Sequence, residues 1–193
     1  MTTVSRETSA QIAQFKEMVG LENQRQNLVS PASLAEFDVR HIDDGAQLVA
    51  LGRPGTWCDI GSGAGLPGVV VAIMTGAPIT LVEPRHLRAE FLRNVVQRLA
   101  LNAEVVEAKA ERVTGQFDNI TARAVAETGK LFAMTEHLAH RGTRWILPKG
   151  RSAKKELAAA EQSWQGRFTL VPSRTSDEAM ILVAEDVRRR GRR

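Results

Sequence analysis

From Thr56 onward, short apolar runs alternate with amphipathic helical patterns, and this alternation limits the possible folds more than any other feature. It is typical of βαβ units, in which each helix leads the chain to the next strand of a parallel sheet. No helical pattern separates the last two strands, so they predict an antiparallel hairpin on an α/β fold with a mostly parallel, seven-stranded sheet. The expected strands are Thr56–Ile60, Ile79–Val82, Glu104–Val106, Asn119–Ala122, Arg144–Leu147, Phe168–Val171 and Met180–Ala184, and the expected helices span about 67–75, 87–100, 127–139 and 152–164.

The chain before this alternation has a purely helical pattern. Apolar side chains recur at helical spacing between residues 8 and 51, and Ser30 followed by proline suits a helix start. The stretch Gly52–Gly55 then interrupts the pattern with two glycines and a proline. We therefore expect a small N-terminal helical extension over residues 1–54 and a core over residues 55–193 that ends in a basic tail.

The charge of the chain favours an anionic partner. Lys and Arg number 26 against 22 Asp and Glu, for a formal net charge of +4. Arginines are concentrated at the C-terminus, where contact with RNA and a merely solvated tail are both open interpretations. They are Arg188, Arg189, Arg190, Arg192 and Arg193.

Cysteine content and hydropathy exclude several classes of protein. A single cysteine, Cys58, cannot form an internal disulfide, and no Cys/His spacing suggests a metal site. Its place within the first expected strand predicts a small buried side chain rather than a covalent nucleophile. No apolar run is long enough to cross a membrane, and the start of the chain lacks the layout of a signal peptide. The sequence therefore predicts a cytoplasmic protein.

A glycine-rich segment between the first expected strand and its helix is the strongest indication of a ligand. In Asp59-Ile60-Gly61-Ser62-Gly63-Ala64-Gly65-Leu66-Pro67-Gly68, the glycines allow a sharp turn and a close approach to a ligand. Amides at the following helix start favour a carboxylate or phosphate. A tight strand-to-helix connection without a ligand is the alternative interpretation.

The spacing of the glycines and the acidic residues nearby favour S-adenosylmethionine. The dinucleotide pattern G-x-G-x-x-G fails because Leu66 follows Gly65. Asp59 could pair with the cofactor's ammonium, while loop amides around Gly61, Gly63 and Gly65 meet its carboxylate. Glu83 ends the second expected strand, where its carboxylate could accept both ribose hydroxyls or remain a solvated charge.

Motifs spread from about Asn23 to Ala184 carry a family resemblance. They are Asn27-Leu28, Arg40-His41-Ile42-x-Asp44, Asp59 to Gly68, Ala110-Glu111, Arg123-Ala124-Val125 and Leu147-Pro148-Lys149-Gly150. On these motifs the chain resembles the RsmG (GidB) family of bacterial enzymes, which methylate N7 of guanine 527 in the 530 loop of 16S ribosomal RNA. The resemblance implies a class I, Rossmann-like methyltransferase that uses S-adenosylmethionine.

The resemblance also implies residue roles. Gly61 and Leu66 would contact the cofactor, Ala110 and Glu111 would flank its adenine, and Arg123 would complete the site from beyond the fourth strand. The chain departs from the family pattern at some positions. It has Glu22 where the family usually has Trp, Gly45 where the family has Ser or Thr, and Ala122 where the family has Ser.

Methylation of guanine N7 fits the residues that the chain has. N7 carries no proton in the neutral base, so alignment is needed more than a general base. Arg123 and Lys149 are the predicted catalytic residues near the mouth of the site, with Arg40, His41 and Arg151 as further candidates for RNA contacts. His41 could instead be a hydrogen-bonding residue between helices.

Other functions remain open at this point. The same cofactor could serve another RNA, a protein or a small molecule, or the chain could be an RNA-binding module without catalysis. For the leading hypothesis the partner is 16S rRNA or a small-subunit particle, with no membrane and no metal, and the protein is expected to be a monomer.

Overall fold

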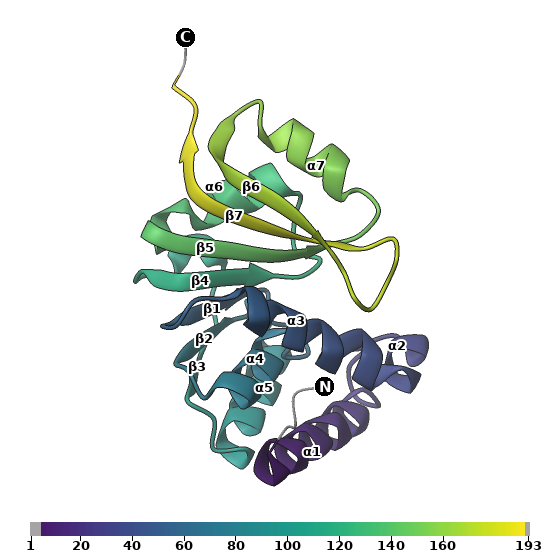
Figure 1. Ribbon diagram of the computed structural model, residues 1–193. Helices are drawn as coiled ribbons and strands as arrows, with labels where there is room; N and C mark the ends of the chain where they lie inside the picture. The colour runs from purple at the N-terminus through teal and green to yellow at the C-terminus, as the bar shows by residue number, and fades with distance from the viewer. Residues whose placement is uncertain (1–4, 192–193) are drawn as a thin grey trace.

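The computed structural model describes residues 5–191, which form one seven-stranded sheet covered by helices on both faces (Figure 1). The strand order is β3-β2-β1-β4-β5-β7-β6. Strands β1 to β5 pair in parallel, whereas β7 lies antiparallel between β5 and β6. The predicted α/β class, parallel sheet and terminal hairpin are therefore confirmed. The strands are β1 (Trp57–Ile60), β2 (Ile79–Val82), β3 (Ala103–Val106), β4 (Phe117–Ala122), β5 (Ala139–Lys149), β6 (Trp164–Pro172) and β7 (Met180–Arg189).

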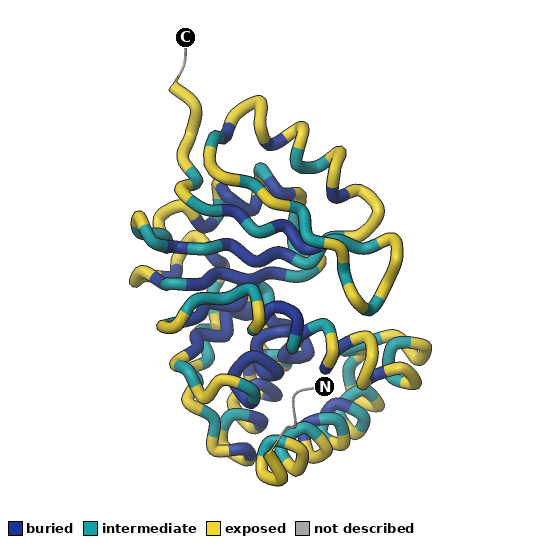
Figure 2. Tube along the Cα trace, in the orientation of Figure 1, coloured by how far each residue is buried: buried dark blue, intermediate teal, exposed yellow. Residues whose placement is uncertain are grey.

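The helices divide between the two faces of the sheet because successive strand residues point to opposite sides. Trp57 and Leu81 join a core with α1, α3, α4 and α5, whereas Cys58 and Val82 join a second core with α6 and α7. Figure 2 shows the buried positions gathered in the central strands and the helices beside them. The helices are α1 (Arg6–Glu22), α2 (Pro31–Ala35), the π-helix η1 (Asp38–Asp43), α3 (Asp44–Leu51), α4 (Gly68–Thr75), α5 (His86–Arg98), η2 (Ala110–Arg112), α6 (Thr128–Thr135), η3 (Glu136–Leu138) and α7 (Ala153–Ala160).

Two predicted helices were too long. The helix expected over 127–139 ends at Thr135, and β5 already begins at Ala139. The helix expected over 152–164 ends at Ala160, and Trp164 begins β6, where its ring packs against Phe132. The first residues of β5 are partly exposed and give no strand pattern, whereas β6 begins at the buried Trp164, which the sequence pattern assigned to the preceding helix.

The N-terminal helices pack directly on the sheet layer. Phe15 and Leu48 lie in the same core cluster as α4 and α5. Gly45 of α3 meets Val70 of α4, where an added Cβ would lie 2.4 Å from Val70 Cγ1. A serine or threonine, usual at this position in the family that the chain resembles, has no room unless Val70 moves. The division at residue 54 stays a prediction.

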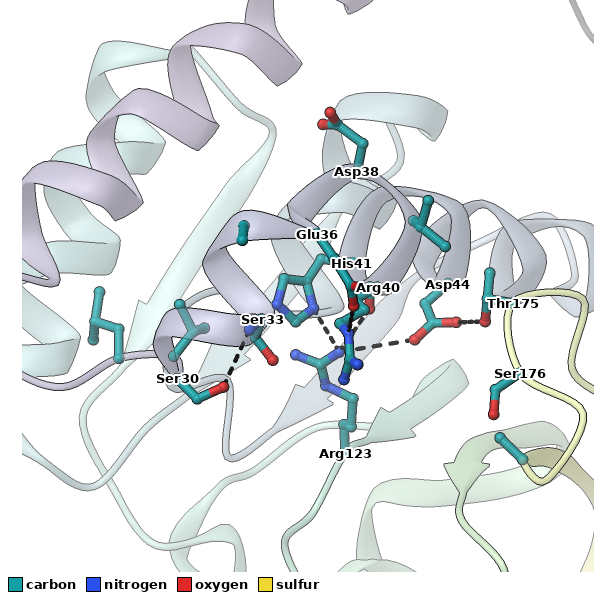
Figure 3. A pocket seen from close by; sticks show the side chains of 15 residues that line it. Ser30, Ser33, Glu36, Asp38, Arg40, His41, Asp44, Arg123, Thr175 and Ser176 are labelled. Atoms are coloured by element: carbon teal, nitrogen blue, oxygen red, sulfur yellow. Dashed lines mark hydrogen bonds and ion pairs between the residues drawn. The ribbon is translucent and has the colours of Figure 1, made fainter.

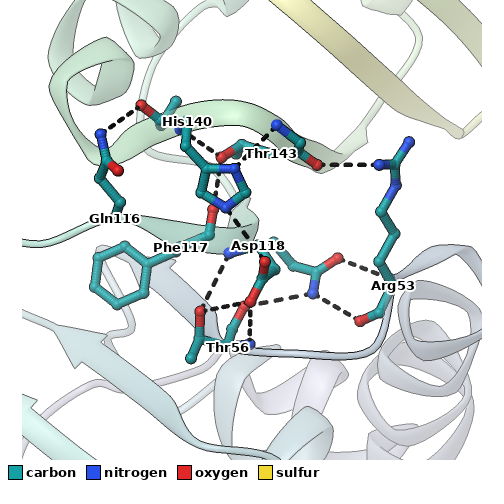
Figure 4. A network of polar contacts seen from close by, with 10 residues as sticks. Arg53, Thr56, Gln116, Phe117, Asp118, His140 and Thr143 are labelled. Atoms are coloured by element: carbon teal, nitrogen blue, oxygen red, sulfur yellow. Dashed lines mark hydrogen bonds and ion pairs between the residues drawn. The ribbon is translucent and has the colours of Figure 1, made fainter.

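The join between the N-terminal helices and β1 is held by a polar network at the end of the sheet (Figure 4). Asn119 Oδ1 accepts from the Arg53 amide at 2.8 Å, and its Nδ2 donates to the Arg53 carbonyl at 2.9 Å. Asp118 accepts from the Thr56 amide at 2.8 Å and contacts His140 Nε2 at 3.2 Å. The join is therefore fixed to β4 and β5.

The single cysteine is buried as predicted. Cys58 has no exposed surface, and burial raises the pKa of its thiol, which makes it a poor nucleophile. In the part of the chain that the structure describes, no helix is both long and apolar enough to span a bilayer. Within residues 5–191, no three His, Cys, Asp or Glu side chains gather where they could hold a metal ion.

Candidate active site

The glycine-rich loop connects β1 to α4 with three glycines in the left-handed region. The φ angles are +69° at Gly61, +54° at Gly63 and +84° at Gly65. A Cβ on Gly61 would lie 2.6 Å from Val125 Cγ2. The glycines are therefore required by backbone conformation at all three positions, and by close packing at Gly61 and Gly65.

This loop forms one wall of a cavity of about 360 Å³, which we call the loop cavity. Arg88 helps to close it, because its Nη2 donates to the Asn27 carbonyl at 3.2 Å. The predicted cofactor residues Gly61, Gly63, Leu66, Glu83 and Arg123 line it together. The remaining lining residues are Leu28, Val29, Ser62, Ala64, Pro84, Arg85, Arg88, Ala124 and Val125.

Glu83 reaches the loop cavity from the end of β2, as predicted. Its Oε2 accepts from the Gly63 amide and its Oε1 from the Arg85 amide, both at 2.9 Å. Only 3% of the residue is exposed. Each carboxylate oxygen has two lone pairs, so each keeps one for a further donor such as a ribose hydroxyl. These two acceptor oxygens therefore fit the ribose hydroxyls of an adenosine cofactor.

Asp59 lies behind the loop and is fully buried. Its Oδ2 accepts from the Gly68 amide at the start of α4 at 3.1 Å, whereas its Oδ1 has no hydrogen-bond partner within the described residues. Burial raises the pKa of this carboxyl to about 7. Asp59 is not among the residues lining the loop cavity, so its pairing with a cofactor ammonium stays a prediction.

The other predicted cofactor residues lie outside the walls of the loop cavity. Gly65 packs on Val69, where a Cβ would lie 2.6 Å from Val69 Cγ2, and so shapes the turn. Ala110 is buried and Glu111 exposed on η2 after β3. Neither lines the loop cavity. Contacts from Ala110 and Glu111 to an adenine stay predictions.

Arg123 follows β4 and lies where three cavities meet. It lines the loop cavity, a cavity of about 1000 Å³ beside the N-terminal helices, and a third of about 460 Å³ near Lys149. We call the last two the helix cavity and the strand-end cavity. Burial lowers the pKa of the guanidinium, partly offset by Asp44 and Asp59. Arg123 thus lies beside the glycine loop, and its contact with a cofactor stays a prediction.

The helix cavity separates the N-terminal helices from the β6–β7 loop (Figure 3). It shares Leu28, Val29 and Arg123 with the loop cavity. The remaining lining residues are Ser30, Ser33, Ala35, Glu36, Asp38, Val39, Arg40, His41, Asp44, Thr175, Ser176 and Ala179.

His41 holds Arg123 at this junction. Arg123 Nη1 lies 2.9 Å from His41 Nδ1 and also donates to the Arg40 carbonyl at 3.3 Å. Burial and the nearby Arg123 charge lower the pKa of His41 to about 4, so its ring is neutral and Nδ1 accepts. Its Nε2 is buried without a partner in the described residues. His41 is therefore a buried hydrogen-bonding residue, but its partner is Arg123 after β4 and not a second helix, as the alternative interpretation expected.

Asp44 faces the same junction from the start of α3. Its Oδ2 lies 4.0 Å from Arg123 Nη1, beyond hydrogen-bonding distance. Thr175 donates a hydrogen bond to its Oδ1, and Gln47 Nε2 donates to the same oxygen at 3.3 Å. Burial raises the pKa of this carboxyl. One oxygen of Asp44 is thus held by the protein, and the other faces Arg123.

Gln47 links α3 to the β6–β7 loop. Its Oε1 accepts from the Arg174 amide at 2.6 Å, and its Nε2 donates to Ser173 Oγ and Thr175 Oγ1, each at 3.4 Å. The side chain is almost fully buried. The loop from the C-terminal hairpin is therefore fixed beside α3, although the two segments are far apart in sequence.

The remaining candidates for substrate contacts are already paired. Lys149 Nζ donates to the Ala126 carbonyl at 3.0 Å and to Glu156 Oε2 at 2.9 Å, with 9% of its side chain exposed. Arg40 pairs with Glu36, and Arg151 with Glu178. Arg40 lines the helix cavity and Lys149 the strand-end cavity. Contacts from these residues to substrate stay predictions.

Sequence reasoning gave no role to Asp44 and Thr175, which line the helix cavity, or to Gln47, which bonds both of them. Asp44 lies three residues after His41, a spacing that places both side chains on one face of a helix. That spacing could have identified Asp44. No local signal identifies Thr175, because its place depends on the packing of the hairpin loop against α3.

The sheet and its glycine loop define the class I methyltransferase fold. A solved S-adenosylmethionine-dependent methyltransferase from Aquifex aeolicus has a TM-score of 0.63 at 15% identity, with 84% of this chain and 96% of that chain covered. TYW2 from M. jannaschii, solved with S-adenosylmethionine, has a TM-score of 0.58 at 12% identity, with 78% and 76% covered. At these identities the likeness shows the fold alone.

Sequence relatives identify the family. The family model for GidB, rRNA small subunit methyltransferase G, matches residues 8–176. The chain is 47% identical to ribosomal RNA small subunit methyltransferase G of Sphingopyxis alaskensis, over 93% of this chain and 79% of that protein. It is 42% identical to the same protein of Rhizorhabdus wittichii, over 98% and 90%. This chain belongs to the rRNA small subunit methyltransferase G family.

Proposed function

We propose that the protein transfers a methyl group from S-adenosylmethionine to N7 of guanine 527 in the 530 loop of 16S rRNA. The observation that carries this proposal is the shared wall of the loop cavity and the helix cavity, formed by Leu28, Val29 and Arg123. A cofactor in the first cavity would lie directly beside a base in the second. Family membership supports a small-subunit rRNA substrate.

Residues around the loop cavity hold the cofactor in this proposal. Glu83 accepts the ribose hydroxyls with its remaining lone pairs. Gly61 and Gly63, whose amides donate to the Val82 carbonyl and to Glu83, let the loop backbone approach the cofactor closely. The bound cofactor supplies a methyl group activated by attachment to a sulfonium. Arg88, tied to the Asn27 carbonyl, keeps solvent from one side of the cavity.

The ionisation of the nearby groups suits a nucleophile that needs no deprotonation. His41 is neutral with Nδ1 occupied by Arg123, and the Lys149 ammonium is matched by Glu156. No general base is required at N7, so these residues have only to position the base and exclude water. Alignment of two neighbouring sites can supply roughly 7–11 kcal/mol of barrier lowering.

A methylation assay with position mapping tests the proposal. The protein is incubated with methyl-labelled cofactor and either 16S rRNA or small-subunit particles, and N7-methylguanine is located by cleavage at the modified base. We expect one labelled guanine, in the 530 loop. Label at another atom or at another RNA position would show that the methylated site differs from the one proposed. No transfer to any form of the RNA would refute the proposal.

The proposed substrate also bears on location and assembly. Ribosomal subunits are made in the bacterial cytoplasm, so we expect the protein there. Both cavities are formed by one chain, so we expect a monomer to be active. Light scattering combined with the methylation assay checks this expectation.

A further inference from the structure

Asp44 lines the helix cavity, and one of its two carboxylate oxygens has no hydrogen-bond partner among the described residues. Three carboxylates line this cavity, and two of them have matched charges, Glu36 with Arg40 and Asp38 with Lys16. Asp44 differs because its nearest cation, Arg123, is 4.0 Å away from Oδ2. Side-chain donors from Thr175 and Gln47 converge on Oδ1 instead. Asp44 Oδ2 is therefore preoriented and able to accept a hydrogen bond from a ligand.

We propose that the helix cavity receives the target guanine and that Asp44 Oδ2 accepts hydrogen bonds from its N1–H and N2 amino group. This inference rests on the proposed function. Its geometric basis is the order of three features along the site. The loop cavity, Arg123 and Asp44 follow one another, with Arg123 lining both cavities. Around guanine, N7, O6 and N1 follow one another in the same order.

This match assigns a partner to each polar group on that side of the base. With N7 directed toward the loop cavity, O6 faces the Arg123 guanidinium, which is a donor only. N1–H and the N2 amino group then face Asp44, which is an acceptor when ionised. His41 and the Arg40 carbonyl keep Arg123 in place for this contact.

The same arrangement discriminates against adenine. Adenine has an unprotonated N1, an acceptor that would oppose the Asp44 carboxylate. Its N6 amino group would oppose the donors of Arg123. Both contacts become unfavourable at once, and a site built for hydrogen bonding rejects a ligand that leaves its polar groups unpaired.

Asp44 also assists the reaction itself. As the N7 lone pair forms a bond to the methyl carbon, the carbon–sulfur bond breaks and its electron pair stays on sulfur. The purine thereby gains a positive charge, and its N1–H becomes more acidic. A hydrogen bond from N1–H to a carboxylate strengthens as this charge develops, so Asp44 stabilises the transition state more than the bound substrate.

The first test combines an isosteric variant with a changed base. Asp44→Asn keeps an oxygen for Thr175 but replaces the second oxygen with a donor. Inosine at the target position lacks the N2 amino group. We expect Asp44→Asn to lower kcat/KM on the guanine substrate about 10- to 100-fold, in line with the loss of a charged hydrogen bond. Inosine should slow the wild type about 10-fold and the variant much less.

Asp43→Asn is the matched control. Asp43 is the preceding residue, exposed and outside the helix cavity, and its loss removes the same charge from the same segment. It should leave both the rate and the guanine-to-inosine ratio unchanged. Equal melting temperatures for the two variants establish that Asp44→Asn is folded.

The second test measures binding without cofactor. N7-methylguanosine monophosphate is a cationic analogue of the product, and adenosine monophosphate is its comparison, with both titrated by NMR. The wild type should prefer the methylguanosine nucleotide, and Asp44→Asn should lose that preference. Unchanged nucleotide preference and an unchanged guanine-to-inosine ratio in Asp44→Asn would overturn the inference while the proposed function stands. If the wild type forms no N7-methylguanine, the proposed function fails, and the nucleotide titration alone then decides the role of Asp44.

Discussion

The loop cavity and the helix cavity differ in how the chain builds them. The loop cavity depends largely on backbone groups from one turn, the β1–α4 loop, together with Glu83 from the next strand. The helix cavity depends on side chains from segments far apart in sequence, including His41, Asp44, Arg123 and Thr175. A backbone that glycines bring close to the cavity suits a cofactor whose chemistry is fixed. Side chains brought together by tertiary packing allow selection of one base.

The largest effect that separates the two cavities should come from Gly61→Arg. The left-handed backbone and the nearby Val125 side chain leave no room for a larger residue. Cofactor affinity should fall at least about 100-fold and methylation should disappear, while RNA affinity is retained. Calorimetry and filter binding measure the two affinities. Gly76→Arg is the control, because Gly76 has a similar φ of +63° with nothing within 4 Å of its added Cβ. Equal loss of RNA binding would show that the cavities are not separable.

A pH effect should come from His41 in the helix cavity. Its folded-state pKa of about 4 lies below the unfolded value of about 6.5, so the unfolded chain binds the proton first. Its contribution is fully present above pH 6.5 and is lost as pH falls toward 4, by up to about 3 kcal/mol. The difference in unfolding free energy between wild type and His41→Asn, followed from pH 7.5 to pH 4.5, isolates this contribution. A difference that does not change with pH would contradict it.

An intermediate effect should come from Gln47→Leu, which removes the link between α3 and the β6–β7 loop. Leaving the Arg174 amide and Asp44 without this partner should cost about 1–3 kcal/mol of stability. We expect kcat/KM for RNA to fall about 10-fold through misplaced Thr175 and Asp44, with cofactor affinity unchanged. Gln11→Leu removes a comparable contact, to the Leu99 carbonyl, away from both cavities and should spare the activity. Weakened cofactor binding in Gln47→Leu would mean that the two cavities depend on the same contacts.

The smallest effect should come from Arg40→Ala at the rim of the helix cavity. Arg40 is exposed and paired with Glu36, so its loss should change stability by less than about 1 kcal/mol. If it contacts one RNA phosphate, affinity falls a few-fold and the slope of log affinity against log salt decreases by about 1. Arg167→Ala on β6, where Arg167 pairs with Asp186, should leave the slope unchanged. Identical slopes for the wild type, Arg40→Ala and Arg167→Ala would exclude the phosphate contact.

The difference between a cavity built from one turn and a cavity built from distant segments also explains which site residues the sequence could predict. The glycines and Asp59 lie in or directly before the turn they shape, and Glu83 follows the expected strand β2, which pairs in parallel with β1 and ends at the same edge of the sheet. The loop and Glu83's place on the loop cavity were therefore predictable. The antiparallel pairing of the terminal hairpin was predictable from the missing helix between its strands, whereas the place of β7 between β5 and β6 was not. Thr175 reaches Asp44 through the packing of β6 and β7, which no local pattern encodes.

Individual charges were the least predictable part of the site. Lys149 was expected near the catalytic mouth, and its sequence position gave no sign that Glu156 and the Ala126 carbonyl occupy its ammonium. Asp59 was predicted to pair with the cofactor, and its burial behind the loop and its hydrogen bond to the Gly68 amide depend on the local backbone path. Pairing and burial decide what a charged side chain is free to contact.

The contact between Gly45 and Val70 has a consequence for how ligands influence each other. Because Gly45 has no side chain, α3, which carries Asp44, packs closely on the Val70 side chain of α4, which begins at the glycine loop, so we expect a displacement of α4 to shift α3. Occupancy of one cavity should therefore alter affinity in the other, and by thermodynamic reciprocity the factor is the same in both directions. Titrating RNA with and without S-adenosylhomocysteine, and the converse titration, measures that factor. A factor of one would mean that the binding of one ligand does not change the affinity for the other.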